Sequence, residues 1–183
     1  MCNEYALERS LEELLSELAE LQMPLGFDGA RPNMEPRPSI RPTDPSYLLV
    51  GDGTGGARLT QRRWGFPGPR GPVINFRSEG RSFPKGRCLA PADAFFEFTG
   101  AKAPKSKWRF ESADRPFLAI AGFIRDDRFT LLTTGPGPDI APYHDRQIVI
   151  FPRERWADWL DTARPQPPIG PLPAGSLKVT QIR

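Results

Sequence analysis

The sequence predicts an α+β fold built as one domain around a β-rich core. Three observations predict it: apolar runs of strand length outnumber helical segments, turn-forming residues separate these runs, and strands do not alternate regularly with helices. At 183 residues, with 38% hydrophobic and 26% charged residues, the chain has the length and composition of a single globular domain. We therefore expect a mixed or antiparallel sheet rather than a doubly wound parallel one.

Two segments have the features of helices. Leucines recur at intervals of three and four residues between glutamates, which predicts an amphipathic helix over residues 7–22 that ends before Pro24. A second helix is predicted over residues 152–160, because the segment begins with Pro152 and proline is favoured in the first helical turn.

Several short runs rich in apolar and β-branched residues predict the strands of the sheet. They lie at residues 47–50, 73–76, 117–124, 129–134 and 147–151. Residues 91–98 form a further short apolar run that ends with a carboxylate. The 22 prolines and 17 glycines concentrate between such runs, and they predict loops at residues 32–45, 66–72 and 164–173.

The cysteines and the single histidine limit the chemistry that the chain can support. Cys2 and Cys88 lie 86 positions apart, without the paired spacing of a zinc site, so we expect no metal. No apolar run is long enough to span a membrane, and no basic and apolar leader opens the chain. We therefore expect a cytoplasmic protein with two thiols, a disulfide being the weaker alternative.

The net charge of +3 is modest, but the basic residues are unevenly distributed. Residues 58–87 contain eight lysines and arginines against one acid, and four aromatic residues lie among them: Trp64, Phe66, Phe76 and Phe83. Basic residues interleaved with aromatic ones are typical of a groove that holds phosphates and stacks bases. A solvated basic face and core packing of the aromatic side chains are the alternatives.

Cys2 occupies the most unusual position in the sequence. Methionine aminopeptidases remove Met1 when the second residue is small, which would leave cysteine at the amino terminus. A terminal cysteine carries an amine and a thiol on adjacent carbons, so an aldehyde can form a Schiff base with the amine and then a thiazolidine with the thiol. Ordinary pKa values of about 7.7 to 8.0 for the amine and about 8.5 for the thiol leave both groups nearly ready at neutral pH. An incidental cysteine is the alternative.

Three further segments carry side chains suited to proton transfer or polar contacts. His144 precedes the predicted strand at residues 147–151 and titrates near neutral pH, although a structural histidine is the alternative. Glu97 follows an apolar run, where burial would raise its pKa unless it faces outward. Asn75 and Arg77 alternate onto one face of a predicted strand, and an ordinary solvent face is the alternative.

Taken together, these segments resemble the SRAP family of SOS-response-associated proteins, in the family's order. Residues 75–79 (Asn-Phe-Arg-Ser-Glu) resemble the family's Asn-Ala-Arg-Ala-Glu signature. Residues 87–98 resemble its Arg-Cys-Leu-x-Pro-Ala-x-Gly-Phe-Tyr-Glu-Trp run. The resemblance extends from residue 1 to about residue 160, and its other matching segments are residues 1–2, 41–43, 64–66, 121–123, 133–134 and 144–146.

The resemblance implies a fold and a function. The fold would be a barrel-like mixed sheet with flanking helices, formed by residues 1–160, with a proline-rich extension of the same domain at residues 161–183. The function would be covalent capture of abasic sites in single-stranded DNA through a thiazolidine on Cys2, which shields the lesion during the DNA damage response. Such a protein is a self-modifying crosslinking enzyme, with abasic-site lyase activity as a further option. We expect a monomer without cofactor, metal or membrane, associated with the nucleoid through DNA.

The resemblance also assigns roles to individual side chains. Asn75 would position the amino terminus and the adduct on Cys2, and Cys88 would be a buried structural thiol. Glu97 and His144 would manage protons, Glu97 in Schiff-base formation and adduct reversal and His144 in opening of the sugar ring. The DNA-binding residues would be arginines that hold phosphates and aromatic residues that stack beside the lesion: Arg63, Arg77, Arg146, Trp64 and Phe66.

The chain departs from the family pattern directly after Cys2. Asn3 and Glu4 stand where the family has glycine and arginine, so a phosphate-binding arginine is missing and Glu4 is expected to repel DNA. Two rival functions stay open: a thiol peptidase or amidase with Cys2 as nucleophile and His144 as base, and a non-catalytic module that binds single-stranded nucleic acid. The peptidase ranks below DNA capture, because only Met1 precedes Cys2 and ordinary methionine removal suffices.

Overall fold

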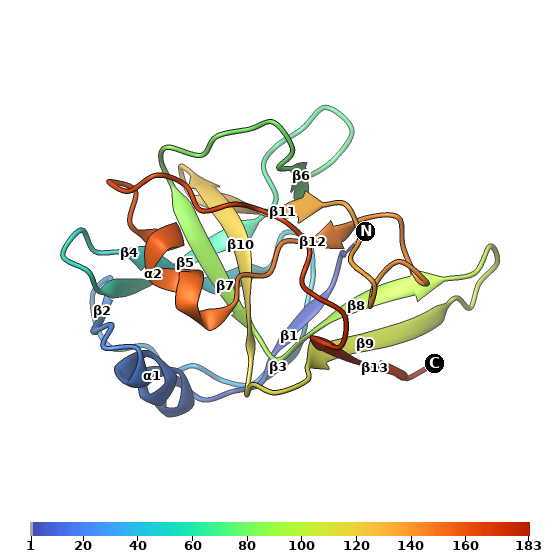
Figure 1. Ribbon diagram of the computed structural model, residues 1–183, viewed down its shortest axis with the longest axis horizontal. Helices are drawn as coiled ribbons and strands as arrows, with labels where there is room; N and C mark the ends of the chain where they lie inside the picture. Colours follow the sequence, from blue (N-terminus) through green and yellow to red (C-terminus); the bar gives the residue numbers. More distant parts are fainter. Residues whose placement is uncertain (1) are drawn as a thin grey trace.

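The larger of two sheets in the fold has eight strands (Figure 1). The computed structural model describes residues 2–183. The strands of this sheet are β2 Leu25–Phe27, β4 Pro45–Gly51, β5 Ala57–Trp64, β6 Asn75–Arg77, β7 Arg87–Ala92, β10 Leu118–Arg125, β11 Arg128–Thr134 and β12 Gln147–Ile148. Their order is β12, β11, β10, β7, β4, β5 and β2, and β6 pairs with β11 beside this path.

The eight-stranded sheet curls until β11 meets β5. These two strands pair in parallel, Arg128 with Arg63 and Phe129 with Trp64, whereas the neighbouring pairs along β4, β5, β7, β10 and β11 are antiparallel. The contact closes five strands into a ring, but two residue pairs make the closure, so the sheet is ring-like rather than a complete barrel. The predicted α+β class, with a β-rich mixed sheet in a single domain, is confirmed.

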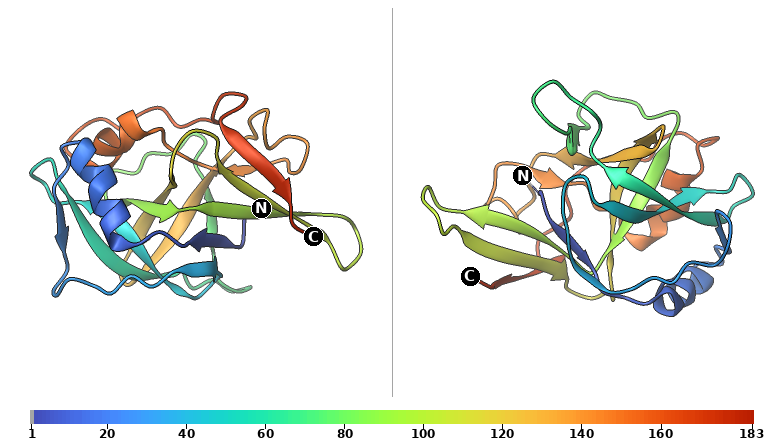
Figure 2. Two further views of the ribbon diagram at one scale, coloured as in Figure 1. Left: turned by 90° about the horizontal axis from the view of Figure 1, so that it is seen from below. Right: turned by 180° about the vertical axis from the view of Figure 1, so that it is seen from behind.

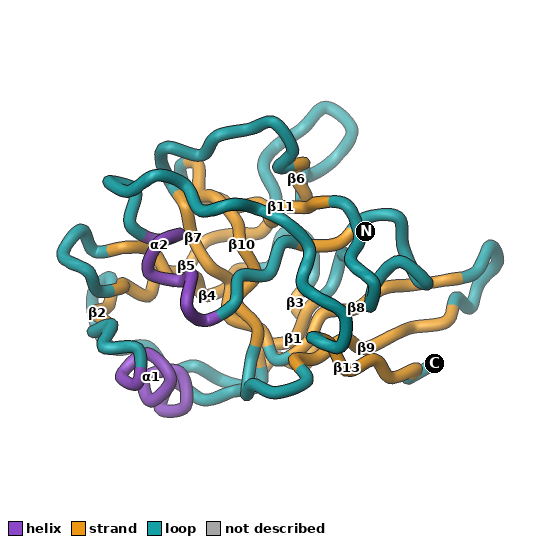
Figure 3. The backbone as a smooth tube through the Cα atoms, in the orientation of Figure 1, coloured by secondary structure: helices purple, strands orange, loops and turns teal. Residues whose placement is uncertain are grey.

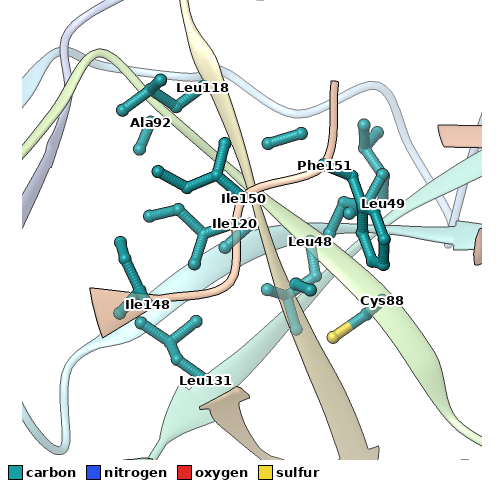
Figure 4. Packing of buried hydrophobic residues seen from close by; sticks show 14 of the residues in the cluster. Leu48, Leu49, Cys88, Ala92, Leu118, Ile120, Leu131, Ile148, Ile150 and Phe151 are labelled. Atoms are coloured by element: carbon teal, nitrogen blue, oxygen red, sulfur yellow. The ribbon is translucent and has the colours of Figure 1, made fainter. Parts of the chain in front are cut away.

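Buried aliphatic side chains from neighbouring strands pack closely against one another (Figure 4). Close approach of β10 to its neighbours requires Gly122, because an added Cβ there would lie 2.6 Å from the carbonyl oxygen of Thr130. Helix α2 (Trp156–Leu160) packs on β7, where the indole Nε1 of Trp159 donates to the carbonyl oxygen of Cys88 at 2.9 Å. The core therefore fixes the strands from which the candidate site is built.

The second sheet contains five strands (Figure 2). In spatial order they are β13 Leu177–Gln181, β9 Ser106–Ser112, β8 Ala94–Thr99, β1 Tyr5–Leu7 and β3 Arg37–Ile40. The sequence predicted one apolar run at residues 91–98, but Asp93 divides this run between β7 of the first sheet and β8 of the second. The chain passes directly from one sheet into the other at this corner.

The helices are shorter than the sequence predicted. Helix α1 (Leu11–Glu20) replaces the predicted helix over residues 7–22, because Leu7 belongs to β1 and Ser10 caps the helix. The Oγ of Ser10 accepts from the backbone N–H of Glu13 at 3.3 Å, while the N–H of Ser10 donates to the Glu13 carboxylate at 2.9 Å. The second predicted helix begins as a 3-10 turn (Arg153–Arg155) before α2.

Loops make up much of the remaining chain, including long stretches on both sides of β6 (Figure 3). The predicted strand at residues 73–76 is shifted to β6, and the one at residues 147–151 is reduced to β12. The proline-rich segment after residue 160 contains a strand that the sequence did not indicate, since β13 pairs antiparallel with β9. Within residues 2–183, neither helix has the length and apolar composition needed to cross a bilayer.

Asp93 ties the end of β1 to the corner between the sheets, which generates a first prediction. Its Oδ2 accepts from the backbone N–H groups of Glu8 at 2.5 Å and Arg9 at 3.0 Å, and its Oδ1 accepts from Nε of Arg9 at 2.8 Å. Because hydrogen bonds to a charged acceptor contribute about 1.5 to 3 kcal/mol, Asp93→Ala is expected to lower the free energy of unfolding by about 2 to 3 kcal/mol in urea titrations.

Asp127→Ala is the matched control for this measurement. The side chain of Asp127 is 78% exposed, so its loss is expected to change the free energy of unfolding by less than about 0.5 kcal/mol. Equal effects of the two substitutions would contradict the role given to Asp93.

Candidate active site

Cys2 lies at the entrance to β1, a strand that pairs with β3 on one side and β8 on the other. The cysteine is 1% exposed, and its Sγ donates to the carbonyl oxygen of Glu4 at 3.4 Å. Burial raises the pKa of the Cys2 thiol, and the charge of Glu97 raises this pKa further. The group is therefore a neutral thiol at pH 7. Cys2 and Cys88 are both free thiols, as the sequence predicted.

Asn75 connects the first sheet to the segment that carries Cys2. It begins β6, which is held in parallel register against β11 by the pairing of Asn75 with Leu131. The side-chain Nδ2 of Asn75 donates to the carbonyl oxygen of Cys2 at 2.7 Å. This hydrogen bond fixes the backbone of a residue 73 positions away in the chain, so β6 determines where the Cys2 backbone lies.

Glu97 projects from β8, the strand beside β1. It is 1% exposed, and burial raises its pKa from 4.5 to about 7. Near neutral pH the carboxyl group is thus divided between its acid and its carboxylate. A group in this condition can donate a proton and accept one at the same pH, as general acid–base chemistry requires. The sequence predicted that burial would raise the pKa of Glu97, and the buried position of this residue on β8 agrees with that prediction.

His144 lies in the loop that leads into β12. Its Nδ1 accepts from the backbone N–H of Arg146 at 3.0 Å, and Oδ1 of Asp145 lies 2.8 Å from the same nitrogen. Burial lowers the pKa of His144, so the neutral imidazole predominates at pH 7. In that neutral form Nδ1 is the acceptor and the proton sits on Nε2. Protonation would instead allow Nδ1 to donate to Asp145.

Glu97 and His144 line one open pocket of about 580 Å³. The other lining residues are Asn3, Phe98, Ala103, Pro104, Lys105 and Arg183. Asn3 connects this pocket with Cys2, its neighbour in the chain. The structure therefore brings Cys2, Asn75, Glu97 and His144 to one region, although they belong to four separate segments. Within residues 2–183, no three His, Cys, Asp or Glu side chains lie together as a metal site would require.

The three arginines expected to hold phosphates lie in different surroundings. Arg77 is exposed on β6, two residues from Asn75. The guanidinium of Arg146 is 13% exposed and holds both carboxylate oxygens of Glu79, with Nη2 to Oε2 at 2.9 Å. This contact lowers the pKa of Glu79 to about 2, so the pair stays charged at neutral pH. Arg63 is exposed on β5, where it pairs with β4 and β11 rather than with β6 or β8.

The aromatic residues expected to stack on bases belong to the core. Trp64 is 0% exposed, its Nε1 donates to the carbonyl oxygen of Ile74 at 2.9 Å, and its ring contacts Tyr5 edge-on with centroids 5.2 Å apart. Phe66 is 6% exposed and packs edge-on against Phe123. In this conformation Trp64 offers no face to a base, and core packing, the alternative weighed from the sequence, describes both side chains.

Glu4 differs from its expected role as a repulsive surface charge. It is 4% exposed, and its Oε1 accepts from Oγ of Ser39 and from Nζ of Lys107, each at 2.8 Å. Burial opposes ionisation, but these hydrogen bonds and the charge of Lys107 lower the pKa of Glu4. The carboxylate is neutralised inside the second sheet, so the expected repulsion of DNA does not follow from its placement.

Sequence reasoning missed several residues of this region. Lys107 contacts Glu4 across 103 positions, and Glu79 contacts Arg146 across 67, so no local pattern indicates either pair. Lys105 and Arg183 line the pocket of Glu97 and His144, yet they lie 78 positions apart in the chain. The pairing of β13 with β9 is what brings Arg183 there, and no pattern of residues indicated that strand.

The raised pKa of Glu97 generates a stability prediction. The folded protein retains this proton up to about pH 7, whereas the unfolded chain releases it near pH 4.5. Stability contributed by the protonated group is therefore complete below pH 4.5 and is lost as the pH rises through 7. Glu97→Gln removes the ionisation, so relative to wild type its free energy of unfolding should increase between pH 4.5 and pH 8, on the order of 3 kcal/mol.

Urea unfolding of both proteins at several pH values between 4.5 and 8 measures this difference. Glu12→Gln is the control, because the side chain of Glu12 is 75% exposed, and its unfolding should follow the pH dependence of the wild type. Parallel pH dependence of wild type and Glu97→Gln would contradict the placement of Glu97 as a buried acid.

Comparison with known proteins identifies relatives along nearly the whole chain. The family described as "SOS response associated peptidase (SRAP)" matches residues 1–182. The chain is 27% identical to "Abasic site processing protein YoqW" of Bacillus subtilis, over 91% of this chain and 83% of the relative. It is 24% identical to "Abasic site processing protein YoaM" of the same organism, over 91% and 82%.

Solved structures show the same fold. A phage-related protein from Bordetella bronchiseptica superposes with a TM-score of 0.72 at 22% identity, over 100% of this chain and 94% of the other. A protein from Bacteroides thetaiotaomicron gives a TM-score of 0.71 at 14% identity, over 100% and 92%. With a family match over residues 1–182 and a shared fold, the chain belongs to the SRAP family of SOS response associated peptidases.

Proposed function

We propose that this protein captures abasic sites in single-stranded DNA as a covalent adduct on Cys2, which shields the lesion during the DNA damage response. The observation that carries the proposal is the convergence of Cys2, Asn75, Glu97 and His144. The relatives named abasic site processing proteins support the same substrate.

The first step joins the α-amine of Cys2 to the aldehyde of the ring-opened abasic sugar. Met1 lies outside the described residues, and its removal is part of the proposal. The amine attacks the carbonyl carbon and gives a carbinolamine, which loses one water to form an imine. Glu97 in its acid form would donate the proton that leaves with the hydroxyl group, and its pKa of about 7 keeps that form available near neutral pH.

The second step closes the five-membered ring. The thiol sulfur of Cys2 adds to the imine carbon, the pair of electrons of the C=N bond goes to nitrogen, and the thiol proton is transferred from sulfur to that nitrogen. The carboxylate form of Glu97 can accept the sulfur proton, because its charge acts directly on the Cys2 thiol. Over both steps the adduct contains the protein and the DNA less one water.

Asn75 and His144 would assist these steps in two different ways, Asn75 by positioning Cys2 and His144 by exchanging protons. Asn75 holds the carbonyl of Cys2 and so restrains the amine and thiol of the same residue, which lowers the entropy lost on reaching the ring geometry. The closed abasic sugar is a hemiacetal that must open to expose its aldehyde. The neutral imidazole of His144, in the pocket of Glu97, can exchange the protons that this opening requires.

The peptidase hypothesis receives less support from the same geometry. A cysteine peptidase attacks as a thiolate, which a nearby cation stabilises. At Cys2, burial and the charge of Glu97 both raise the thiol pKa, and the nearby imidazole is neutral at pH 7. Ring closure on Cys2 needs no thiolate formed beforehand, because the Glu97 carboxylate can accept the sulfur proton as the sulfur adds to the imine carbon.

Intact mass spectrometry with an abasic oligonucleotide tests the proposal directly. The wild-type protein, free of Met1, is expected to gain the mass of the oligonucleotide less one water, and Cys2→Ala is expected to form no thiazolidine adduct. Cys88→Ala is the matched control, because Cys88 is an equally buried thiol that carries no adjacent terminal amine. An adduct that persists in Cys2→Ala under conditions that hydrolyse imines, or that disappears in Cys88→Ala, would contradict the assignment of Cys2.

The rate of adduct formation should depend on pH through two groups. The amine must be neutral, which favours pH above its ordinary pKa of about 7.7 to 8.0. The acid form of Glu97 must be present, and it is lost as the pH rises through about 7. The rate is therefore expected to reach a maximum between about pH 7 and 8 and to fall on both sides.

Glu97→Gln separates the two groups. This variant should react more slowly at every pH and should lack the decline on the alkaline side, because glutamine does not titrate. Rates from quenched gel assays between pH 5 and 9 provide the measurement. A wild-type rate that stays flat across this range would count against proton transfer by Glu97.

A further inference from the structure

The pocket of Glu97 and His144 has two cationic residues that the proposed chemistry does not use. Lys105 lies in the turn between β8 and β9, and Arg183 follows β13. Both are exposed, and neither belongs to the basic stretch at residues 58–87.

Hydrogen bonds hold these two residues side by side. The Nε of Arg183 donates to the carbonyl oxygen of Lys105 at 3.0 Å, and the backbone N–H of Lys107 donates to the carbonyl oxygen of Arg183 at 2.9 Å. The guanidinium of Arg183 also lies 5.9 Å from the ring centre of Phe98. Arg183 is therefore fixed to the β8–β9 hairpin, although it comes from another segment.

In the part of the chain that the structure describes, neither of these two cationic side chains is held by a carboxylate of another residue. Within residues 2–183, no carboxylate of another residue forms an ion pair with Lys105 or Arg183, whereas neighbouring Lys107 is paired with Glu4. The titratable groups that face them are Glu97, which is partly neutral near pH 7, His144, which is neutral, and the exposed Asp145 beside His144. Neither side chain is engaged in an ion pair with another described residue, so both cationic groups are available to an anionic ligand.

The position of Cys2 indicates where that anion would lie. Cys2 is bonded to β6 through Asn75, while β1 pairs with β8 on the other side. Figures 1 and 2 show the β8–β9 hairpin and β6 on opposite sides of the start of β1. Arg77 is exposed on β6, so cations lie on both sides of the reactive residue. A strand that passes over Cys2 would meet Arg77 with one phosphate and the hairpin with another.

We infer that Lys105 and Arg183 form a phosphate-binding site for the DNA strand on the hairpin side of the lesion. The inference rests on the proposed function, since it assigns further contacts to the same substrate. Lysine and arginine contribute here as positive charges, and the guanidinium fork of Arg183 adds directional donors for phosphate oxygens. The site binds backbone and therefore recognises no base sequence.

Binding of an undamaged single-stranded oligonucleotide tests this site without any covalent chemistry. Fluorescence anisotropy of wild type and of the double variant Lys105→Ala, Arg183→Ala gives the dissociation constant at several NaCl concentrations. Each phosphate contact on a single strand contributes about 0.7 to the slope of log affinity against log salt concentration. The double variant is expected to bind more weakly at low salt, with a slope reduced by about 1.4.

A charge-matched control removes two cations elsewhere. Arg115 and Lys178 are exposed and lie outside both the pocket and residues 58–87, so Arg115→Ala, Lys178→Ala lowers the net charge equally. This variant should keep the wild-type slope. The variant Lys105→Arg, Arg183→Lys keeps both charges and should also retain most of the slope, even where the hydrogen bond from Arg183 is weakened.

The outcomes separate this inference from the proposed function. Equal slopes for the alanine double variant and its control would overturn the phosphate site, as would a wild-type affinity that does not depend on salt. If the abasic oligonucleotide gives no adduct while the slopes differ as expected, the covalent function fails and the phosphate site stands. If the adduct forms and the slopes are equal, the covalent function stands and Lys105 and Arg183 have no part in binding.

Discussion

The insertion of β1 between β3 and β8 holds in place the segment on which the candidate site depends. A chain end usually frays, because its backbone groups find few partners. Here Tyr5 pairs with Ile40 on one side and Phe95 on the other, and its buried ring packs against Trp64 of the first sheet. Cys2 lies three residues before this anchor, within reach of Asn75. The two sheets thus converge on the amino-terminal segment, and each supplies residues to the site.

Burial of this segment also sets the protonation of the reactive groups. It keeps the thiol of Cys2 neutral, brings the pKa of Glu97 to about 7 and lowers the pKa of His144. A site with these three groups carries little fixed charge at neutral pH. Such a site suits attack by a neutral amine on a carbonyl, followed by transfer of protons among groups of similar acidity. Above pH 7 the buried carboxylate of Glu97 lowers the stability of the fold, so function and stability make opposing demands on this residue.

The sequence predicted those strands that contain an unbroken run of apolar and β-branched residues. The strands near residues 47–50, 117–124 and 129–134 were found because apolar runs mark them, and they correspond to β4, β10 and β11, with β10 beginning one residue later than predicted. By contrast, β5 and β9 carry charged residues among apolar ones, and β13 is short and mostly exposed, so their hydrogen-bonded partners define them more than their composition does.

The residues of the candidate site also fall into two groups, those that the sequence indicated and those whose surroundings only the fold determines. Residue types alone indicated Cys2, Glu97 and His144, since each chemistry needs a particular side chain. Composition did not distinguish a base-stacking groove from a core, and Trp64 belongs to the core. Nor did it show that Glu4 is neutralised by Lys107, because that contact depends on the pairing of β8 with β9 and of β1 with β8.

Under the proposed function, these ion pairs would limit how the protein holds DNA. The Glu79 carboxylate occupies the guanidinium of Arg146, and the pKa of Glu79 is about 2, so a phosphate would have to displace a charged, two-pronged partner. Glu4 likewise occupies Lys107. In the proposed complex, backbone affinity would rest on cations without an ion pair to another described residue, such as Arg77, Lys105 and Arg183. Few such contacts would give a weak, reversible complex, because each phosphate contact adds to the affinity. Under the proposed function, discrimination between damaged and intact strands would come from the aldehyde itself, because intact strands would dissociate while an abasic site would become bonded to Cys2.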